Sequence, residues 1–237
     1  MASATLAQLR DQTIIDNSIE GNPAFPTTRL NRMINLAQRY VQTMLNGLGM
    51  NKWEVSQSIT AGLTSASFAS AALSPNVKTV TIGTTYFTNM LESPNSIRFI
   101  SVDDGTNFGI AYPVSPDTFL EHLNNSYLAP SAKKPIFMRL ANSVYLAPLA
   151  ITSATAFYFR AVLDLSADTD VSEIPQEFEE FVVKKVGIEI NNILGNLQDK
   201  QLALNQLDKD LTQAYEKFIG KQNEITRFKR TDNAKVQ

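Results

Sequence analysis

The sequence predicts an α+β fold, in which the N- and C-terminal helices form a helical bundle and a β-rich domain is inserted between them. Apolar residues recur at helical spacing near both ends of the chain, while short β-branched and aromatic runs fill the middle. A content of 43% hydrophobic and 19% charged residues is typical of a folded core. The expected boundaries are 1–52 and 163–223 for the bundle, 53–162 for the insert and 224–237 for a polar basic tail.

Two helices are expected at the N-terminal end. The first covers about residues 5–17 and is followed by a loop with two prolines, which cannot continue a helix. The second begins after Thr27 or Thr28 as its N-cap and stops at Gly47 and Gly49. Its apolar positions keep the 3.6-residue period for five turns: Leu30, Met33, Ile34, Ala37, Val41, Met44, Leu45 and Leu48.

The middle of the chain is predicted to be β-structure. The sequence Asp103-Asp104-Gly105 between two β-prone runs is typical of a hairpin turn. Residues 55–91 carry one formal charge, Lys78, which indicates either a packed sheet or a surface segment that a partner covers. The β-prone runs are residues 77–82, 97–102, 108–112, 136–140, 144–146 and 156–162.

Two further helices are expected at the C-terminal end. Pro175 suits the first turn of a helix, and the acidic residues after it favour the positive end of the helix dipole. This helix stops at Gly195, and a last helix covers about residues 197–222. Because an amphipathic helix cannot bury its apolar stripe alone, the helices of both ends are expected to pack together.

Composition excludes several classes of protein. The formal charge of −2 leaves no global positive field for binding a phosphate backbone. The absence of cysteine removes disulfides, thiolate metal sites and cysteine nucleophiles, and a single histidine, His122, removes a histidine metal cluster. No apolar run is long enough to cross a bilayer and no signal peptide is recognised, so synthesis in a cytoplasm is expected.

Four acidic residues near position 170 are the strongest candidates for chemistry. Asp164, Asp168, Asp170 and Glu173 have the oxygen ligands that a hard cation prefers. They lack the spacing of a calcium loop, so turn and helix capping is the favoured interpretation. A carboxylate-bound divalent cation with enzymatic activity stays open as an alternative, and a melting shift on titration with calcium or magnesium would favour it.

The remaining acidic and glycine candidates have structural interpretations. Asp103 and Asp104 are adjacent and point to opposite sides of a strand end, which favours a turn over a catalytic carboxylate pair. Gly47, Gly49 and Gly195 follow helices and do not lie between a strand and a helix, so they are expected to be caps and not a phosphate loop. No catalytic, cofactor-binding or metal-binding residue is therefore predicted.

Three other features have two interpretations each. His122 is expected to be solvated or to cap a helix, because no nucleophile and acid are arranged around it. Trp53 either closes the end of the bundle, which is favoured, or anchors an interface. The basic tail either is solvated, which is favoured, or contacts DNA or an acidic partner. Its residues are Arg227, Phe228, Lys229, Arg230 and Lys235.

Two segments resemble the head-to-tail adaptor proteins of tailed bacteriophages. Residues 25–41, FPTTRLNRMINLAQRYV, are similar to the opening helix of that family, in which an Arg-Leu…Ile-Asn-x-Ala-Gln pattern follows a proline. Residues 157–178 are similar to its closing half, with the aromatic trio Phe157, Tyr158 and Phe159 before the acidic loop. The resemblance includes the tail tubular protein A type and the neck ring proteins of crAss-like phages.

The resemblance implies a structural subunit of a virion ring, with no enzymatic activity and no cofactor. Family members commonly assemble as homo-oligomeric rings of twelve, dock on the portal protein and bridge it to the tail or to a second ring protein. DNA would pass through without specific binding, and no membrane is involved. Such a protein would be made in the host cytoplasm and reside in the neck of the virion.

Other functions stay open from the sequence. Another virion ring, such as a stopper or a fibre-docking collar, differs from the adaptor in the neighbour that the β-rich insert touches. A binding module that uses the basic tail would show a salt-dependent affinity for nucleic acid, lost on removal of residues 224–237.

Overall fold

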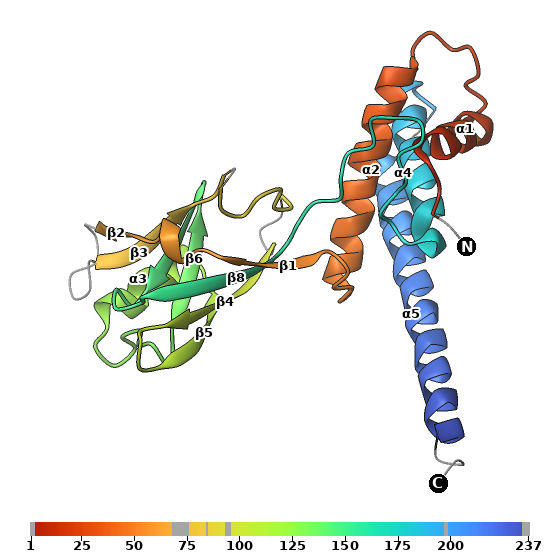
Figure 1. Ribbon diagram of the computed structural model, residues 1–237. Coiled ribbons are helices and arrows are strands. Elements are labelled where there is room, and N and C mark those ends of the chain that lie inside the picture. The colour runs from red at the N-terminus through yellow and green to blue at the C-terminus, as the bar shows by residue number, and fades with distance from the viewer. Residues whose placement is uncertain (1–2, 68–75, 84, 93–95, 197–198, 234–237) are drawn as a thin grey trace. The chain divides into compact units, whose positions relative to one another are not determined.

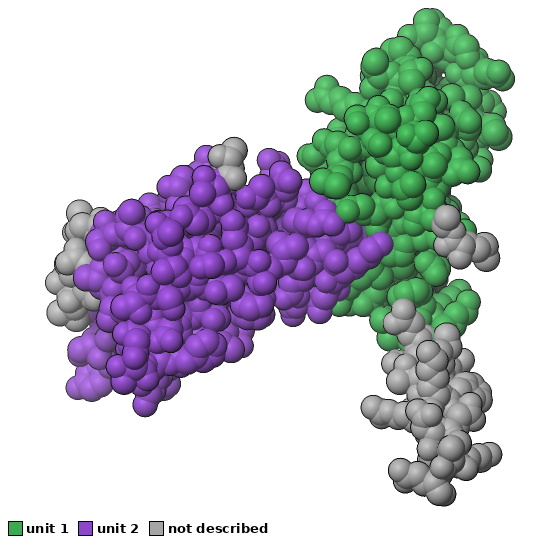
Figure 2. All heavy atoms as spheres, viewed as in Figure 1, with its two compact units in different colours: residues 1–50, 162–237 green, residues 51–161 purple. Residues whose placement is uncertain are grey.

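The computed structural model describes residues 3–67, 76–83, 85–92, 96–196 and 199–233, with side chains up to residue 221 (Figure 1). The chain divides into two compact units (Figure 2). The helical unit comprises residues 1–50 and 162–237, and the sheet unit comprises residues 51–161. Of the low-charge segment 55–91, residues 68–75 and 84 lie outside the described residues.

Helix α1 (Leu6–Asn17) begins at a capping box. The Thr5 hydroxyl accepts a hydrogen bond from the backbone N–H of Gln8, and the Gln8 side chain accepts one from the backbone N–H of Thr5. Leu6, Leu9 and Thr13 form its buried side, and the Thr13 hydroxyl donates to the Leu9 carbonyl. The predicted helix at residues 5–17 is confirmed.

Helix α2 (Thr27–Gly47) has the predicted apolar side and a different start. Leu30, Ile34, Val41 and Leu45 are buried, as the 3.6-residue period indicates. The prediction of a threonine N-cap is wrong, because Pro26 occupies that position and no side chain caps the helix. Pro26 has an extended backbone with a ψ of 156°, so Thr27 is the first helical residue.

Two glutamines interrupt the apolar side of α2. Gln38 and Gln42 are fully buried, so their amide groups need partners from the protein. The Gln42 carbonyl accepts the backbone N–H of Val162 at 2.9 Å, and the Gln38 carbonyl accepts the Ser172 hydroxyl at 2.9 Å. Both partners lie in the segment that returns from the sheet unit, so this segment closes the side of α2.

Helix α4 (Glu179–Ile193) is the centre of the helical unit. It follows the 3-10 helix η2 (Gln176–Phe178), and α1, α2 and α5 all pack against it. Val182, Val186 and Ile190 are completely buried along its length. Helix α4 ends where Gly195 adopts a positive φ of 73°, as the predicted stop at this glycine requires.

Helix α5 (Lys200–Asn233) is longer than predicted. Its backbone continues eleven residues past the expected end at Gln222, through a stretch without glycine or proline. Near α4 it buries Leu207 and Leu211. Its Tyr215 and Phe218 rings pack on Phe178, with centroid distances of 6.4 and 5.5 Å.

The predicted fold class needs correction. The helices do not form a regular bundle of N- and C-terminal helices: α1, α2 and α5 pack around α4, and α1 with 12 residues and α4 with 15 are far shorter than α5 with 34. The β-rich part is a single curled sheet of eight strands. The chain is mixed, α+β overall. An apolar stripe shows that a helix buries one side but not which helices it meets, and this is why the bundle was expected.

The eight-stranded sheet has the order β1-β8-β4-β5-β6-β7-β3-β2. All neighbours are antiparallel except β5 and β6, which α3 (Pro116–Asn124) connects. The predicted hairpin is confirmed by β4 and β5, which pair Ile100 with Ala111 and Asp103 with Phe108. The strands are β1 (Glu54–Ser58), β2 (Thr64–Ser67), β3 (Asn76–Thr81), β4 (Ile97–Asp103), β5 (Phe108–Pro113), β6 (Ile136–Leu140), β7 (Ser143–Ala147) and β8 (Ser153–Phe159).

The sheet has an extensive apolar core on one side and an outer face that is only partly covered. The apolar side includes Ile100, Phe137, Leu146 and Tyr158, from four different strands. On the other side, Phe119 and Leu123 of α3 pack on Val77, Met138 and Ala147 of β3, β6 and β7. Helix α3 therefore covers the β6, β7 and β3 part of this outer face.

The buried side of α2 and α4 yields a stability prediction. Ile34→Asp or Phe181→Asp is expected to abolish folding, because both side chains are buried and an unpaired buried carboxylate costs several kcal/mol. Thr43→Asp, at an exposed position of α2, is a control with an expected loss of no more than about 1 kcal/mol. Circular dichroism melting measures both. A soluble Ile34→Asp variant that melts cooperatively would contradict the assignment of this core.

Candidate assembly surfaces

The acidic loop, defined here as residues 163–174, contains the four predicted carboxylates. The Asp168 carboxylate accepts two hydrogen bonds from Arg10 of α1, at 2.8 and 3.3 Å. The Asp164 carboxylate accepts hydrogen bonds from Arg39 of α2 at 2.9 Å. These ion pairs are partly exposed, so each contributes little free energy alone. Their geometry nevertheless ties the loop to both N-terminal helices.

Backbone contacts extend this attachment. The carbonyl of Asp170 accepts the N–H of Leu6 at 2.9 Å, and the carbonyl of Asp168 accepts the N–H of Ala7 at 3.2 Å. These two N–H groups belong to the first turn of α1, where a helix provides no acceptor of its own. The side chain of Asn35 exchanges two hydrogen bonds with the backbone of Leu165. The loop thus completes the start of α1 and covers α2.

The carboxylate of Asp170 holds the turn of the loop together. It accepts the backbone N–H groups of Ala167 and Ser166, at 2.8 and 2.7 Å, and the Ser166 hydroxyl. The backbone hydrogen bonds from Ala167 and Ser166 lower the pKa of Asp170. The hydrogen bond and charge of Arg10 lower the pKa of Asp168.

The carboxylates of the acidic loop therefore act as caps and pairs. Asp164, Asp168 and Asp170 each point to a different partner, and the Glu173 carboxylate accepts the N–H of Leu163 at 3.1 Å. Across the described ranges, no group of three or more His, Cys, Asp or Glu side chains converges as metal ligands. This geometry supports the capping interpretation and gives no support to the cation alternative.

The other polar candidates also have local partners. Asp103 accepts the N–H of Gly105 at 2.6 Å, and Asp104 accepts the N–H groups of Asn107 and Thr106, which lower its pKa. Both carboxylates thus shape the turn between β4 and β5. His122 is half-buried in the last turn of α3.

The structure places the remaining candidates at helix ends and in the core. Gly49 follows α2 with a φ of 102°, which favours glycine, and Gly47 is the last residue of that helix. Trp53 is buried, with 1% of its surface exposed. The basic residues from Arg227 to Arg230 lie on the backbone of α5, while Lys235 lies outside the described residues.

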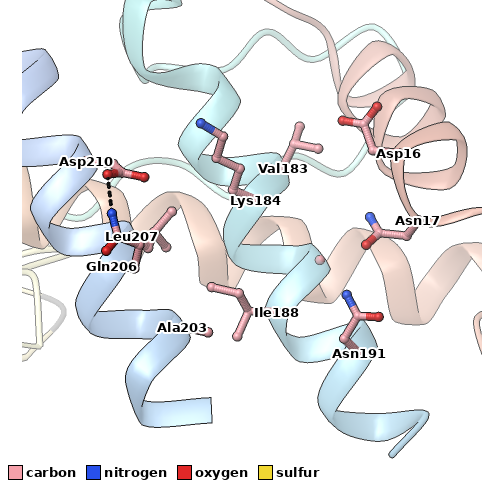
Figure 3. A pocket seen from close by; sticks show the side chains of 11 residues that line it. Asp16, Asn17, Val183, Lys184, Ile188, Asn191, Ala203, Gln206, Leu207 and Asp210 are labelled. Carbon is pink, nitrogen blue, oxygen red and sulfur yellow. Dashed lines mark hydrogen bonds between the residues drawn. The ribbon is translucent and has the colours of Figure 1, made fainter. Parts of the chain in front are cut away.

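One exposed groove lies between α1, α4 and α5, and we call it the acidic groove (Figure 3). Its volume is about 430 Å³. Val183, Ile188, Ala203 and Leu207 supply apolar surface, and Asp16 and Asp210 bring carboxylates to it. Gly187 allows α1 to approach α4, because a Cβ atom there would lie 2.8 Å from Oδ1 of Asn17.

A second surface lies on the outer side of α2, and we call Arg29, Arg32 and Leu36 the basic ridge. Leu36 is 56% exposed and lies beside the two arginines on the solvent side of the helix. A neighbouring groove runs from Arg32, Met33 and Leu36 to Lys185 and Ile193 of α4.

The two surfaces lie on opposite sides of α4. Val183, Gly187 and Ile188 border the acidic groove, whereas Lys185 and Ile193 border the groove beside the basic ridge. At about 100° per residue, these two sets point in nearly opposite directions around the helix axis. The helical unit therefore has two unlike exposed sides.

The sheet unit has an exposed apolar surface of its own, the aromatic face. Phe108, Ile110 and Tyr112 of β5 alternate with small residues and are 64%, 40% and 61% exposed. The stacked rings of Phe99 and Phe157, 4.4 Å apart, lie on β4, which pairs with β5, and on β8, the next strand beyond β4. This part of the outer face lies beyond the strands that α3 covers, and exposed apolar surface of this kind is typical of interaction sites.

Comparison with known families identifies the protein class. Residues 4–234 match the family described as SU10 adaptor protein, which is nearly the whole chain. The chain belongs to this family of phage adaptor proteins. No curated protein matches it. The adaptor family is structural, so this chain is a virion-associated structural component, and the family fits the expectation that it is not an enzyme.

The exposed surfaces of this adaptor were missed in the sequence. Leu36 lies off the apolar stripe of α2, between Arg32 and Arg39, and this position is a visible signal. In β5, Phe108, Ile110 and Tyr112 alternate with glycine and alanine, but alternation alone does not show which side faces the core. None of the described helices is both long and apolar enough to span a membrane.

The lowered pKa values in the acidic loop predict acid sensitivity. A carboxyl group with a lowered pKa stabilises the folded state above its unfolded pKa of about 3.9, and this contribution is lost as the pH falls through the folded value. Asp170→Ala is therefore expected to flatten the fall in unfolding free energy between pH 4 and pH 2.5. Urea unfolding at several pH values measures it. The exposed Glu216→Gln variant should retain the slope of the original protein, and an unchanged slope in Asp170→Ala would contradict the prediction.

Proposed function

We propose that this adaptor is the subunit of a ring in the phage neck, which docks on the portal protein and joins it to the tail. The observation that carries the proposal is the set of three unlike exposed surfaces: the acidic groove, the basic ridge and the aromatic face. A subunit of a closed ring needs two different sides for its neighbours in the ring. It needs at least one more surface for a protein above or below.

The two units suit different parts of this task. The helical unit, with unlike surfaces on opposite sides of α4, is proposed to supply most contacts between subunits of the ring, commonly twelve in number. The aromatic face of the sheet unit and the end of α5 are proposed to reach the portal and the tail or a second ring protein. An apolar patch centred on aromatic side chains is typical of the core of a protein interface.

The charge of the chain suits a channel through which DNA passes. With 21 basic and 23 acidic residues, the subunit lacks the excess of positive charge that retains a phosphate backbone. We propose that the assembled ring surrounds the DNA without binding it specifically. The protein would be made in the host cytoplasm and then assembled into the neck of the virion.

Another virion ring is the alternative, either a stopper or a collar that docks fibres. The aromatic face is the observation behind this alternative. Its exposed apolar side chains suit a protein at the side of the neck as well as one along its axis. Electron microscopy of the intact particle separates the two functions, because it shows which protein contacts Phe108 and Tyr112.

The proposal predicts assembly with the portal. The purified adaptor, mixed with portal rings, is expected to form a ring on one end of the portal. Native mass spectrometry gives the number of adaptor subunits, and electron microscopy gives the position of the ring. A protein that stays monomeric and never joins the portal would overturn the proposal.

The aromatic face can be tested in the same experiment. The double variant Phe108→Ser and Tyr112→Ser should still form rings but bind the portal or the tail protein at least tenfold more weakly, because it removes exposed apolar contact surface. Tyr127→Ser is the matched control, since Tyr127 is 96% exposed and lies outside the aromatic face. Equal binding by both variants would exclude the aromatic face from the axial interface.

A further inference from the structure

We infer that the basic ridge of one subunit inserts into the acidic groove of the next copy of this chain. The inference rests on the proposed ring and names the surfaces that hold neighbouring subunits together. It follows from three properties of the helical unit: the shape of the two surfaces, their charges and their positions around α4.

Shape and polarity make the two surfaces complementary. The basic ridge lies on α2 at the border of the groove toward α4, and its apolar side chain, Leu36, is 56% exposed. The groove is hollow, and Val183, Ile188 and Leu207 supply apolar surface in it (Figure 3). Helices usually pack by fitting side-chain ridges of one helix into grooves on the surface of another. Burial of Leu36 there would remove apolar surface from water.

The charges that remain without an opposite partner are positive on the ridge and negative at the groove. Arg32 has no polar partner within the described part of the chain, and Arg29 donates only to the backbone carbonyl of Ala24, at 2.8 Å. Among the described residues, the carboxylates of Asp16 and Asp210 accept only neutral amide groups, from Gln12 at 2.8 Å and Gln206 at 2.7 Å.

Nearby charges of the same helices are already paired. Lys185 and Lys200 both reach Glu189, at 2.5 and 2.8 Å. Lys184, which also lines the acidic groove, lies 3.6 Å from Glu180 on its own helix. These lysines and glutamates are therefore paired inside the subunit, whereas Arg32 and Asp210 are available to a partner of opposite charge.

Position excludes pairing within one subunit and favours a ring. The ridge and the groove lie on opposite sides of α4, so Arg32 cannot reach the groove of its own chain. When subunits join through two unlike surfaces, the growing assembly has a free basic ridge at one end and a free acidic groove at the other after each added subunit. Such a head-to-tail contact builds a ring when its rotation closes, whereas a two-fold dimer would place the same surface on both sides.

Charge reversal tests the contact. Arg32→Glu and Asp210→Arg, made singly in the full chain, each place like charges at the inferred interface. Each is expected to raise at least tenfold the protein concentration at which half of the subunits are in rings. The double variant reverses both partners and should recover most of the assembly. Lys209→Glu, an exposed change of the same kind on α5 outside the groove, should assemble like the original protein.

The readouts are analytical ultracentrifugation, with and without portal rings, and circular dichroism melting to show that each variant is folded. Loss in both single variants with recovery in the double variant supports the inference. Two results overturn the inference and leave the proposed ring intact, provided that the original protein forms rings. In the first, the single variants assemble like the original protein. In the second, they lose assembly and the double variant does not recover it.

Two further outcomes are also decisive. An original protein that forms no ring, even on the portal, refutes the proposed function itself. If a charge-reversed variant is unfolded, Leu36→Ser carries the test, because this exposed change leaves the charges in place and should weaken assembly at least tenfold. Normal assembly of that variant would overturn the inference.

Discussion

The helical unit depends on the hydrogen bonds of two glutamines that are buried on the apolar side of α2. Gln38 and Gln42 have no contact with water, so an unpaired amide there would cost about 1 to 3 kcal/mol. Their partners, Ser172 and Val162, lie 120 or more positions further along the chain. Helix α2 is therefore complete only when the chain has returned from the sheet unit. The acidic loop then caps α1, and η2 and α4 follow it along the chain.

The sheet unit is built so that this return is possible. Its first strand, β1, pairs antiparallel with its last strand, β8, and Glu54 lies opposite Phe159. The two ends of the insert therefore leave the sheet side by side. A large domain can be inserted into the helical unit in this way without separating the segments that must meet there. The sheet has its own core, so its fold does not depend on the glutamines of α2.

The charges and apolar side chains that have no partner inside the subunit indicate where other proteins bind. The carboxylates of the acidic loop are used internally, for caps and ion pairs, and no chemistry is assigned to them. Exposed apolar groups and unpaired charges are instead found on the basic ridge, in the acidic groove and on the aromatic face. These surfaces belong to a chain of the SU10 adaptor protein family, whose role is structural. Contact with water makes the free energy of the exposed Leu36 and Phe108 side chains less favourable, and burial against another protein removes this cost.

The sequence by itself determined the local structure. Helices α1 and α2, the hairpin of β4 and β5, and the stop of α4 near Gly195 follow from apolar spacing and from glycine and aspartate in turns, which act within a few residues. Only the tertiary structure decided which helices pack on α4, and that eight strands form one curled sheet. It also decided that Leu36 and Phe108 are exposed and that Gln38 and Gln42 are buried. Periodicity gives the direction of a side chain around its own helix or strand, but its burial depends on elements that arrive from more than a hundred residues away.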